Sequence, residues 1–340
     1  MKETLFGMNR QEIENLVREA GWERYVADQI AGWLYKRHVH DPGLMTDLSK
    51  SAREYLSARY APGVHEPVKV QVSADSTKKY LFRASGNSYV EAAVIPEGER
   101  NTLCLSTQVG CKMGCLFCLT GKQGFQGHLS AAEILNQYNS LPERERITNI
   151  VYMGMGEPLD NLESVLKSTE VFTASWGYGM SPRRMTVSTI GIIPAMRTFI
   201  EQSRCHLAVS LHSPFEEERR YLMPVETVYP LKDVVMVLKE YDLGRQRRIS
   251  FEYIMFEGLN DTDRHVKELA RLLNGLRCRI NLIRYHSVPG IPLKSSSDEV
   301  IDRFAINLNH KGIRTTVRAS RGEDIFAACG LLSTRELMMR

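Results

Sequence analysis

The stretch that decides the fold is residues 102–118, Thr-Leu-Cys-Leu-Ser-Thr-Gln-Val-Gly-Cys-Lys-Met-Gly-Cys-Leu-Phe-Cys. Its first six residues, 102–107, predict a β-strand. Cysteines then follow at positions 111, 115 and 118, in the spacing C-x3-C-x2-C. Because so compact a group of thiols directly follows a strand, the sequence predicts a metal centre in the loop after it.

Composition places the rest of the chain in an ordinary class. With 340 residues, 43% hydrophobic side chains and a net charge of +4, it is neither disordered, collagen-like nor a small disulfide scaffold. The first residues become acidic too early for a secretory signal, and no run approaches the roughly 20 apolar residues of a membrane span. We therefore expect a cytoplasmic protein without a membrane segment. Its 7 cysteines should then serve metal or redox chemistry, since such thiols stay reduced there.

The pattern of predicted elements changes near residue 90. Helical periodicity at 11–19 and 26–37 precedes short strands at 68–72, 79–82 and 89–94. Beyond residue 100, helices alternate with strands at 102–107, 149–154, 185–189, 206–212, 249–256 and 279–285. Capping patterns at Ser130 with Glu133 and at Asp160 with Glu163 predict two helix starts. Six such units predict an α/β fold with an incomplete barrel, in which chemistry lies at the carboxyl ends of the strands.

The domain organisation follows from this change. We expect an accessory region over 1–90, helical with short strands, a core over 91–330, and a tail over 331–340.

Two kinds of metal centre agree with the cysteine spacing. Three thiolates can hold a [4Fe-4S] cluster whose fourth iron stays open to an outside ligand. Alternatively, Cys104 or His128 can complete a four-ligand zinc site.

The cysteine motif, with Phe117 before its last cysteine, resembles that of the radical S-adenosylmethionine (SAM) superfamily. This resemblance implies a partial (β/α)6 TIM-like barrel, a [4Fe-4S] cluster on Cys111, Cys115 and Cys118, and cleavage of SAM to a 5′-deoxyadenosyl radical. It also implies that segments at the strand ends bind SAM, namely Gly156, Glu157, Ser188, Ser210, Leu211, His212 and His286. The last position departs from the pattern, because many members of the superfamily have asparagine there.

Longer segments narrow the resemblance to the RlmN/Cfr family of RNA methyltransferases. They are residues 95–97, 100–104, 120–125, 152–159 and 327–330, and the similarity extends over essentially the whole chain. It implies methylation of carbon 2 of an adenine in 23S rRNA and of an adenine beside the tRNA anticodon. A Cfr-like methylation of carbon 8 of the same rRNA adenine is the alternative. A zinc-stabilised RNA-binding protein without catalysis is a second alternative.

The family's chemistry implies roles for residues outside the cluster. Cys329 would carry a methyl group from one SAM, and a second SAM per turnover would supply the radical. Cys104 would release the product by forming a disulfide with Cys329, and Glu91 would accept a proton. Without the resemblance, Cys329 reads as a small buried residue and Glu91 as a solvated charge. Cys205 and Cys278 match no motif and are expected in the core.

The expected partners are 23S rRNA, tRNA and an electron donor such as flavodoxin, and we expect a monomer. Lys36 and Arg37, between Tyr35 and His38, resemble part of the family's accessory RNA-binding domain. Several arginines can bind phosphates or merely be solvated, namely Arg183, Arg184, Arg245, Arg247, Arg248, Arg314, Arg318 and Arg321.

Overall fold

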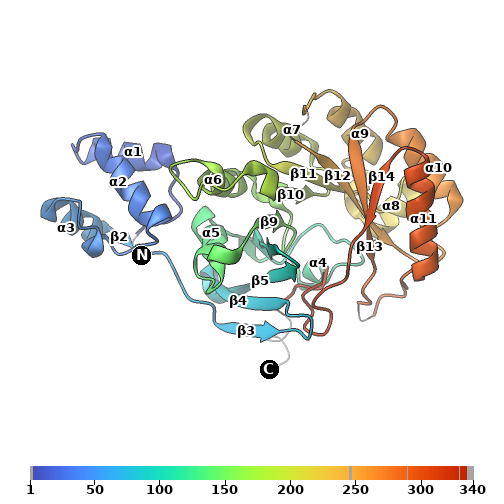
Figure 1. Cartoon of the computed structure of the whole chain (residues 1–340), viewed down its shortest axis with the longest axis horizontal. Coiled ribbons are helices and arrows are strands. Elements are labelled where there is room, and N and C mark those ends of the chain that lie inside the picture. The colour runs from blue at the N-terminus through green and yellow to red at the C-terminus, as the bar shows by residue number, and fades with distance from the viewer. Residues whose placement is uncertain (1–2, 245–246, 289, 329, 335–340) are drawn as a thin grey trace.

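The computed structural model describes residues 3–244, 247–288, 290–328 and 330–334. A ten-stranded sheet in the order β14-β13-β12-β11-β10-β9-β6-β5-β4-β3 forms its centre. The strands from β6 to β14 are parallel, whereas β3 to β6 pair antiparallel. Helices cover the parallel part, and a separate helical lobe lies beside it (Figure 1).

The parallel part is the predicted incomplete barrel, with one strand more than expected. Its strands are β6 Arg100–Cys104, β9 Asn149–Tyr152, β10 Met185–Thr189, β11 His206–Ser210, β12 Ile249–Met255, β13 Cys278–Arg284 and β14 Arg314–Val317. The intervening helices are α5 Ala131–Asn139, α6 Leu162–Thr173, α7 Ile193–Gln202, α8 Glu216–Leu222, α9 Leu231–Lys239, α10 Asp263–Leu272 and α11 Asp298–His310. The six predicted strands are confirmed, and β14 is the seventh. Since β14 and β3 are the two ends of the strand order, the sheet stays open.

Of the two predicted helix starts, one is confirmed and one is wrong. The Ser130 hydroxyl accepts the Glu133 amide proton at 3.2 Å, and the Glu133 carboxylate accepts from the Ser130 amide at 2.8 Å. Asp160, in contrast, lies in a 3-10 turn, Pro158–Asn161, and α6 begins only at Leu162. The Asp160 carboxylate instead binds the side chains of Gln108 and Lys112, both at 2.7 Å.

The short strands before residue 100 belong to the main sheet. They are β3 Lys69–Val72, β4 Lys78–Ala84 and β5 Ser88–Glu97. The boundary expected at residue 90 therefore falls inside β5, and the helical lobe ends before β3. This extension carries Glu91 next to the first parallel strand, because Ala93 pairs with Cys104.

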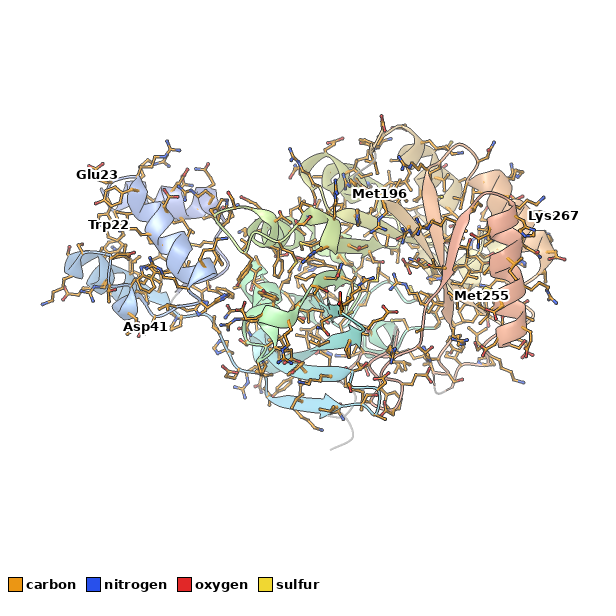
Figure 2. All side chains as sticks on the ribbon, in the orientation of Figure 1. Trp22, Glu23, Asp41, Met196, Met255 and Lys267 are labelled. Carbon is orange, nitrogen blue, oxygen red and sulfur yellow. The ribbon has the colours of Figure 1, made fainter. Side chains whose placement is uncertain are left out.

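The lobe consists of β1 Glu3–Thr4, α1 Arg10–Glu19, α2 Tyr25–Ala31 with a π-helical turn Gly32–Lys36, α3 Lys50–Arg59 and β2 Tyr60–Ala61. Trp22 and Asp41 mark it in Figure 2, while Met255 marks β12 of the barrel. Among the described residues, no helix is both long and apolar enough to cross a bilayer.

Aromatic side chains join the lobe to the barrel. The buried ring of Tyr35 lies 5.8 Å from Trp176 and 5.6 Å from Tyr178, and its hydroxyl donates to the Met8 carbonyl. The ring of His38 stacks on Tyr178 at 5.7 Å. The rings of Tyr35 and His38 therefore pack against other parts of the protein. Within the segment 35–38, only Lys36 and Arg37 remain as candidates for RNA contacts.

Candidate active site

The three predicted metal ligands share one loop at the carboxyl edge of the sheet. Cys111, Cys115 and Cys118 lie between β7 Gln108–Val109 and α4 Leu119–Gln123, and all three are half-buried. Two backbone hydrogen bonds hold the second half of this loop, from the Leu116 amide to the Leu222 carbonyl at 2.9 Å and from the Leu119 amide to the Gly330 carbonyl at 2.8 Å.

Their electrostatics suit a bound cation. Burial, together with the neighbouring thiols, raises the pKa of Cys111 to about 12 and the pKa of Cys115 well above its usual range. Thiolates so close together need positive charge nearby, which the irons of a cluster supply. In a [4Fe-4S] cluster each of three thiolates binds its own iron, so three cysteines in one half-buried loop fit the group.

The turn after β9 requires glycine at two places. A Cβ on Gly154 would lie 2.7 Å from the Leu105 carbonyl oxygen. Gly156 has a φ of +98°, and a Cβ there would lie 2.5 Å from the Gln108 side chain. The backbone of this turn can therefore approach the end of β6 closely, beside the cysteine loop.

Glu157 joins the ends of two strands. Its buried carboxylate accepts from the amides of Leu159 at 3.1 Å and Ile190 at 3.0 Å, so it links the turn after β9 to the end of β10. Burial raises its pKa to about 7, although the hydrogen bonds oppose that shift. The structure thus gives Glu157 a bracing role, and its predicted contact with SAM stays a prediction.

This raised pKa predicts a pH-dependent stability. Because the folded state holds the Glu157 proton more tightly than the unfolded chain, with its pKa near 4.5, the contribution of Glu157 to stability is fully present below that pKa and is lost as pH rises to about 7. We expect the midpoint of thermal unfolding to fall less in Glu157→Gln than in the unsubstituted protein between roughly pH 5 and pH 8. Equal slopes in calorimetric scans of the two proteins would contradict this expectation.

Four of the other predicted SAM residues, at the ends of β10 and β11, divide into two groups. Ser188 and Ser210 lie on the strand faces that also present Thr186 and His206 to a cavity. Leu211 and His212 are buried instead.

His212 braces neighbouring segments. Its φ is +57°, its Nδ1 accepts from the Ile254 amide at 3.0 Å, and its ring meets Phe117 of the cysteine motif edge-on at 4.7 Å. Burial lowers its pKa to about 3, so the imidazole is neutral.

Sequence reasoning missed the buried Arg219 of α8. Its guanidinium donates to the carbonyls of Ile190, Ser210 and Leu211 at 2.9, 3.1 and 3.2 Å, and pairs with Glu226. The sequence around it, Glu-Glu-Glu-Arg-Arg at 216–220, is typical of a solvated helix face, so no signal in the sequence could have found it.

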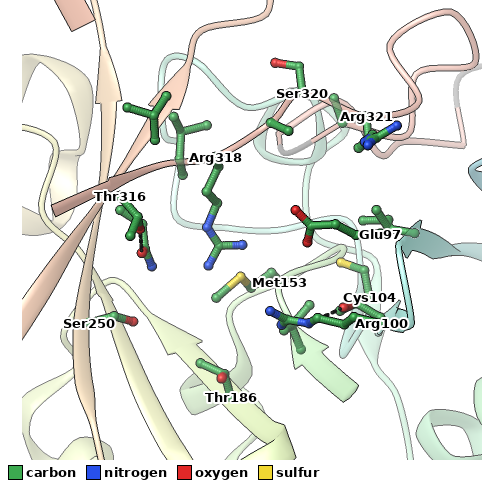
Figure 3. A pocket seen from close by; sticks show the side chains of 18 of the residues that line it. Glu97, Arg100, Cys104, Met153, Thr186, Ser250, Thr316, Arg318, Ser320 and Arg321 are labelled. Carbon is green, nitrogen blue, oxygen red and sulfur yellow. Dashed lines mark hydrogen bonds between the residues drawn. The ribbon is translucent and has the colours of Figure 1, made fainter. Parts of the chain in front are cut away.

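A cavity of about 430 Å³ opens inside the barrel. Figure 3 shows Cys104 and Met153 at one part of its wall and Arg318 extending into the same space. Ala327 and Ala328 also line it. Cys329 lies outside the described residues, but its two preceding neighbours therefore share one cavity with Cys104.

Glu91 lies on the same face of β5 as Ile95 and Glu97, two residues that line the cavity. Its carboxylate is 3.1 Å from the Lys79 ammonium, with only 4% of either side chain exposed, and it accepts from the Ser333 amide at 2.9 Å. Glu91 is thus no solvated charge.

His286 lines the cavity, and its predicted contact with SAM stays a prediction. Its Nδ1 lies 3.3 Å from the Glu323 carboxylate and its Nε2 lies 3.4 Å from the Ser320 hydroxyl. Cys205 is buried in the core, and Cys278 packs partly buried against it, in agreement with the expectation for both.

This fold and this site define a radical SAM protein. The family model "Radical SAM superfamily" matches residues 105–273, and "Ribosomal RNA large subunit methyltransferase N-terminal domain" matches residues 4–61. The crystal structure of a radical SAM methyltransferase from Sphaerobacter thermophilus superposes with a TM-score of 0.89, at 38% identity over 97% of this chain and 99% of that one. The cofactors are therefore a [4Fe-4S] cluster and SAM.

The relatives narrow the class. A probable dual-specificity RNA methyltransferase RlmN from Bacteroides thetaiotaomicron is 52% identical over 98% of this chain and 96% of its own. The dual-specificity RNA methyltransferase RlmN of Syntrophus aciditrophicus is 41% identical over 97% and 96%. The chain belongs to the RlmN family of radical SAM methyltransferases, and neither the C8 alternative nor the zinc alternative is favoured.

Proposed function

We propose that this protein methylates carbon 2 of an adenine in 23S rRNA and of an adenine beside the tRNA anticodon. The observation that carries the proposal is full-length similarity to dual-specificity RNA methyltransferases, at about half identity. The shared cavity of Cys104 and the segment before Cys329 supports it, because the family's chemistry needs both thiols at one base.

The cofactors would be held at the carboxyl edge of the barrel. Cys111, Cys115 and Cys118 hold the cluster, which when bound supplies the electron that cleaves SAM. SAM is bound at the strand ends, by Gly156, Glu157, Ser188, Ser210, Leu211, His212 and His286. Glu157 and His212 serve mainly by fixing the backbone there, since their side chains bind the amides of neighbouring segments.

The chain's own thiols then transfer the carbon atom. Carbon 2 of adenine lies between two ring nitrogens and is too electron-poor to attack the methyl group of SAM. Cys329 therefore takes a methyl group by displacement, loses one hydrogen atom from it, and adds to the base through the resulting methylene radical. Glu91 accepts the proton of carbon 2, the unpaired electron of the adduct would return to a one-electron acceptor such as the oxidised cluster, and Cys104 releases the product by forming a disulfide with Cys329.

The remaining partners are also proposals. We infer a cytoplasmic monomer that receives electrons from a small redox protein such as flavodoxin.

The decisive test is methylation by anaerobically reconstituted protein. Transcripts of the 23S rRNA segment and of tRNA are each treated with SAM and reductant, digested to nucleosides and analysed by mass spectrometry. We expect 2-methyladenosine from both RNAs. Recovery of 8-methyladenosine alone would overturn the C2 assignment, and iron-free protein holding one zinc would overturn radical chemistry.

Lys79 provides a sharper prediction about Glu91. Replacing Lys79 with methionine removes the ammonium that lies 3.1 Å from this buried carboxylate and favours the protonated form of Glu91, which cannot accept a proton. We expect the methylation rate near neutral pH to fall by about 10²-fold or more, and to recover in part as pH rises. Iron content and RNA affinity should not change.

Lys78→Met is the matched control. Lys78 directly precedes Lys79 on β4, but its ammonium lies 3.3 Å from the Glu143 carboxylate, and both side chains of that pair are more exposed. Its pH–rate profile should match that of the unsubstituted protein, and Lys79→Arg should restore most of the activity. A uniform loss of rate at every pH in Lys79→Met would show a purely structural role.

A further inference from the structure

Arginines surround the amino end of the barrel, the end opposite the cysteine loop. Six of the seven parallel strands have an arginine at or within two residues of their first position. These arginines are Arg100, Arg183, Arg184, Arg204, Arg247, Arg248, Arg277, Arg279 and Arg314. Since β12 alone has 7 residues, the two ends of the barrel are on the order of 20 Å apart.

Five arginines line the cavity itself. Arg100, Arg248 and Arg279 come from the amino ends of three strands, whereas Arg318 and Arg321 follow the last residue of β14. Figure 3 shows Arg100 and Arg318 extending into the same open space. Burial lowers the pKa of Arg100 and of Arg279, and each is lowered further by the charges of Arg248 and Arg318. The guanidinium groups thus repel one another across the cavity.

Two carboxylates offset part of this repulsion. The charge of Glu97, which lines the cavity, acts on Arg100, and the buried Glu252 carboxylate lies 3.3 Å from the Arg318 guanidinium. Within the described parts of the chain, Arg100, Arg248 and Arg279 form no salt bridge: Arg100 donates to the Thr102 hydroxyl, and Arg248 lies 3.3 Å from the His206 ring. Burial and the nearby arginines lower the pKa of His206 to about 4, so that ring is neutral. A group of cations held together in this way favours a polyanionic partner.

The neighbouring Arg247 shows what a structural arginine looks like here. Its guanidinium donates to the carbonyls of Cys205 at 2.8 Å and Ile200 at 2.6 Å, on the outer side of the barrel. It fixes backbone and is not available to a ligand, whereas the next residue, Arg248, is exposed and faces the cavity.

We propose that Arg248 and Arg279, with Arg100, bind the RNA phosphates on either side of the target nucleotide, whose base enters the cavity from this amino end. The inference rests on the proposed function and assigns the part of the protein that receives the RNA backbone. A base that reacts must leave its stack to reach an enclosed site, while its flanking phosphates stay outside. Cations spread over several strands suit such a backbone better than they suit one small anion.

The test is the salt dependence of RNA binding. We would measure the dissociation constant of a fluorescent hairpin carrying the target adenosine, at several potassium chloride concentrations, for the reconstituted protein and for Arg248→Gln with Arg279→Gln. Each lost phosphate contact should lower the slope of log K against log salt by roughly 0.7 to 0.9. We expect the double variant to bind about tenfold more weakly at low salt. The lysine versions, which keep the charge, should restore the slope.

Arg303→Gln is the matched control, because Arg303 is exposed on α11 and does not line the cavity. It changes the net charge by the same amount per site and should leave the slope unchanged. Equal slopes in the glutamine double variant and in Arg303→Gln would overturn the inference. If the unsubstituted protein binds RNA with the expected slope and forms no 2-methyladenosine, the proposed function fails while the binding site stands.

Discussion

Replacing Arg219 with methionine is expected to lower the free energy of unfolding by about 3–5 kcal/mol, as breaking a buried ion pair does elsewhere. The substitution leaves Glu226 buried without its cation, since neither side chain is more than 3% exposed. It also removes the donors to three carbonyls at the ends of β10 and β11. Those carbonyls would be left buried without partners, which adds to the cost.

The same substitution should weaken the cluster site, because α8 holds the cysteine loop through the Leu222 carbonyl. We expect less iron per protein after reconstitution. The neighbouring Arg220 is the control: it is exposed and pairs with Glu216 on the helix surface, so Arg220→Met should change stability by no more than about 0.5 kcal/mol. Chemical denaturation of the three proteins, with iron analysis, measures both effects. Similar unfolding free energies for Arg219→Met and Arg220→Met would contradict the bracing role.

The parallel strands could be predicted because each is a short apolar run between helical patterns. The edge strand β14 could not, since Arg-Thr-Thr-Val at 314–317 is short and polar and gains its place by pairing with β13. The start of α6 was misplaced at Asp160, because a carboxylate bound by Gln108 and Lys112 looks in sequence like a helix cap. The sequence pattern of a segment predicts the structure of that segment alone. The place of β14 and the contacts of Asp160, in contrast, depend on residues elsewhere in the chain.

The site shows the same division. Cysteine spacing and glycines before Glu157 mark the cluster loop and its neighbouring turn, because metal ligation and close backbone approach demand those residue types. Arg219 and Lys79 escape such reasoning, since their burial depends on groups brought together by three or more segments. His212 shows the opposite case. The sequence motif singles it out as a ligand-binding residue, but in the structure its ring accepts a hydrogen bond from the Ile254 amide.

Replacing Cys104 with alanine is expected to limit the protein to about one reaction per molecule and to leave RNA covalently attached. In the proposed chemistry the base is tethered to the Cys329 sulfur through a methylene group. The Cys104 thiolate attacks that sulfur, so an S–S bond forms while the S–CH2 bond breaks. The electron pair passes to the carbon, which takes a proton to become the methyl group. Two cysteines are oxidised, the methylene carbon is reduced, and a thiol reductant restores the enzyme.

The proposed role suits Cys104 and does not suit Cys205. Its thiol lines the cavity together with Ala327 and Ala328, whereas Cys205 is buried in the core beneath the sheet. Cys205→Ala is therefore the matched control, removing a thiol of similar burial without access to the base. Labelled RNA on a denaturing gel should co-migrate with protein only in Cys104→Ala. If Cys104→Ala released free RNA containing 2-methyladenosine over many turnovers, another group would have to break the covalent link. Cys104 would then only line the cavity, without a part in the reaction.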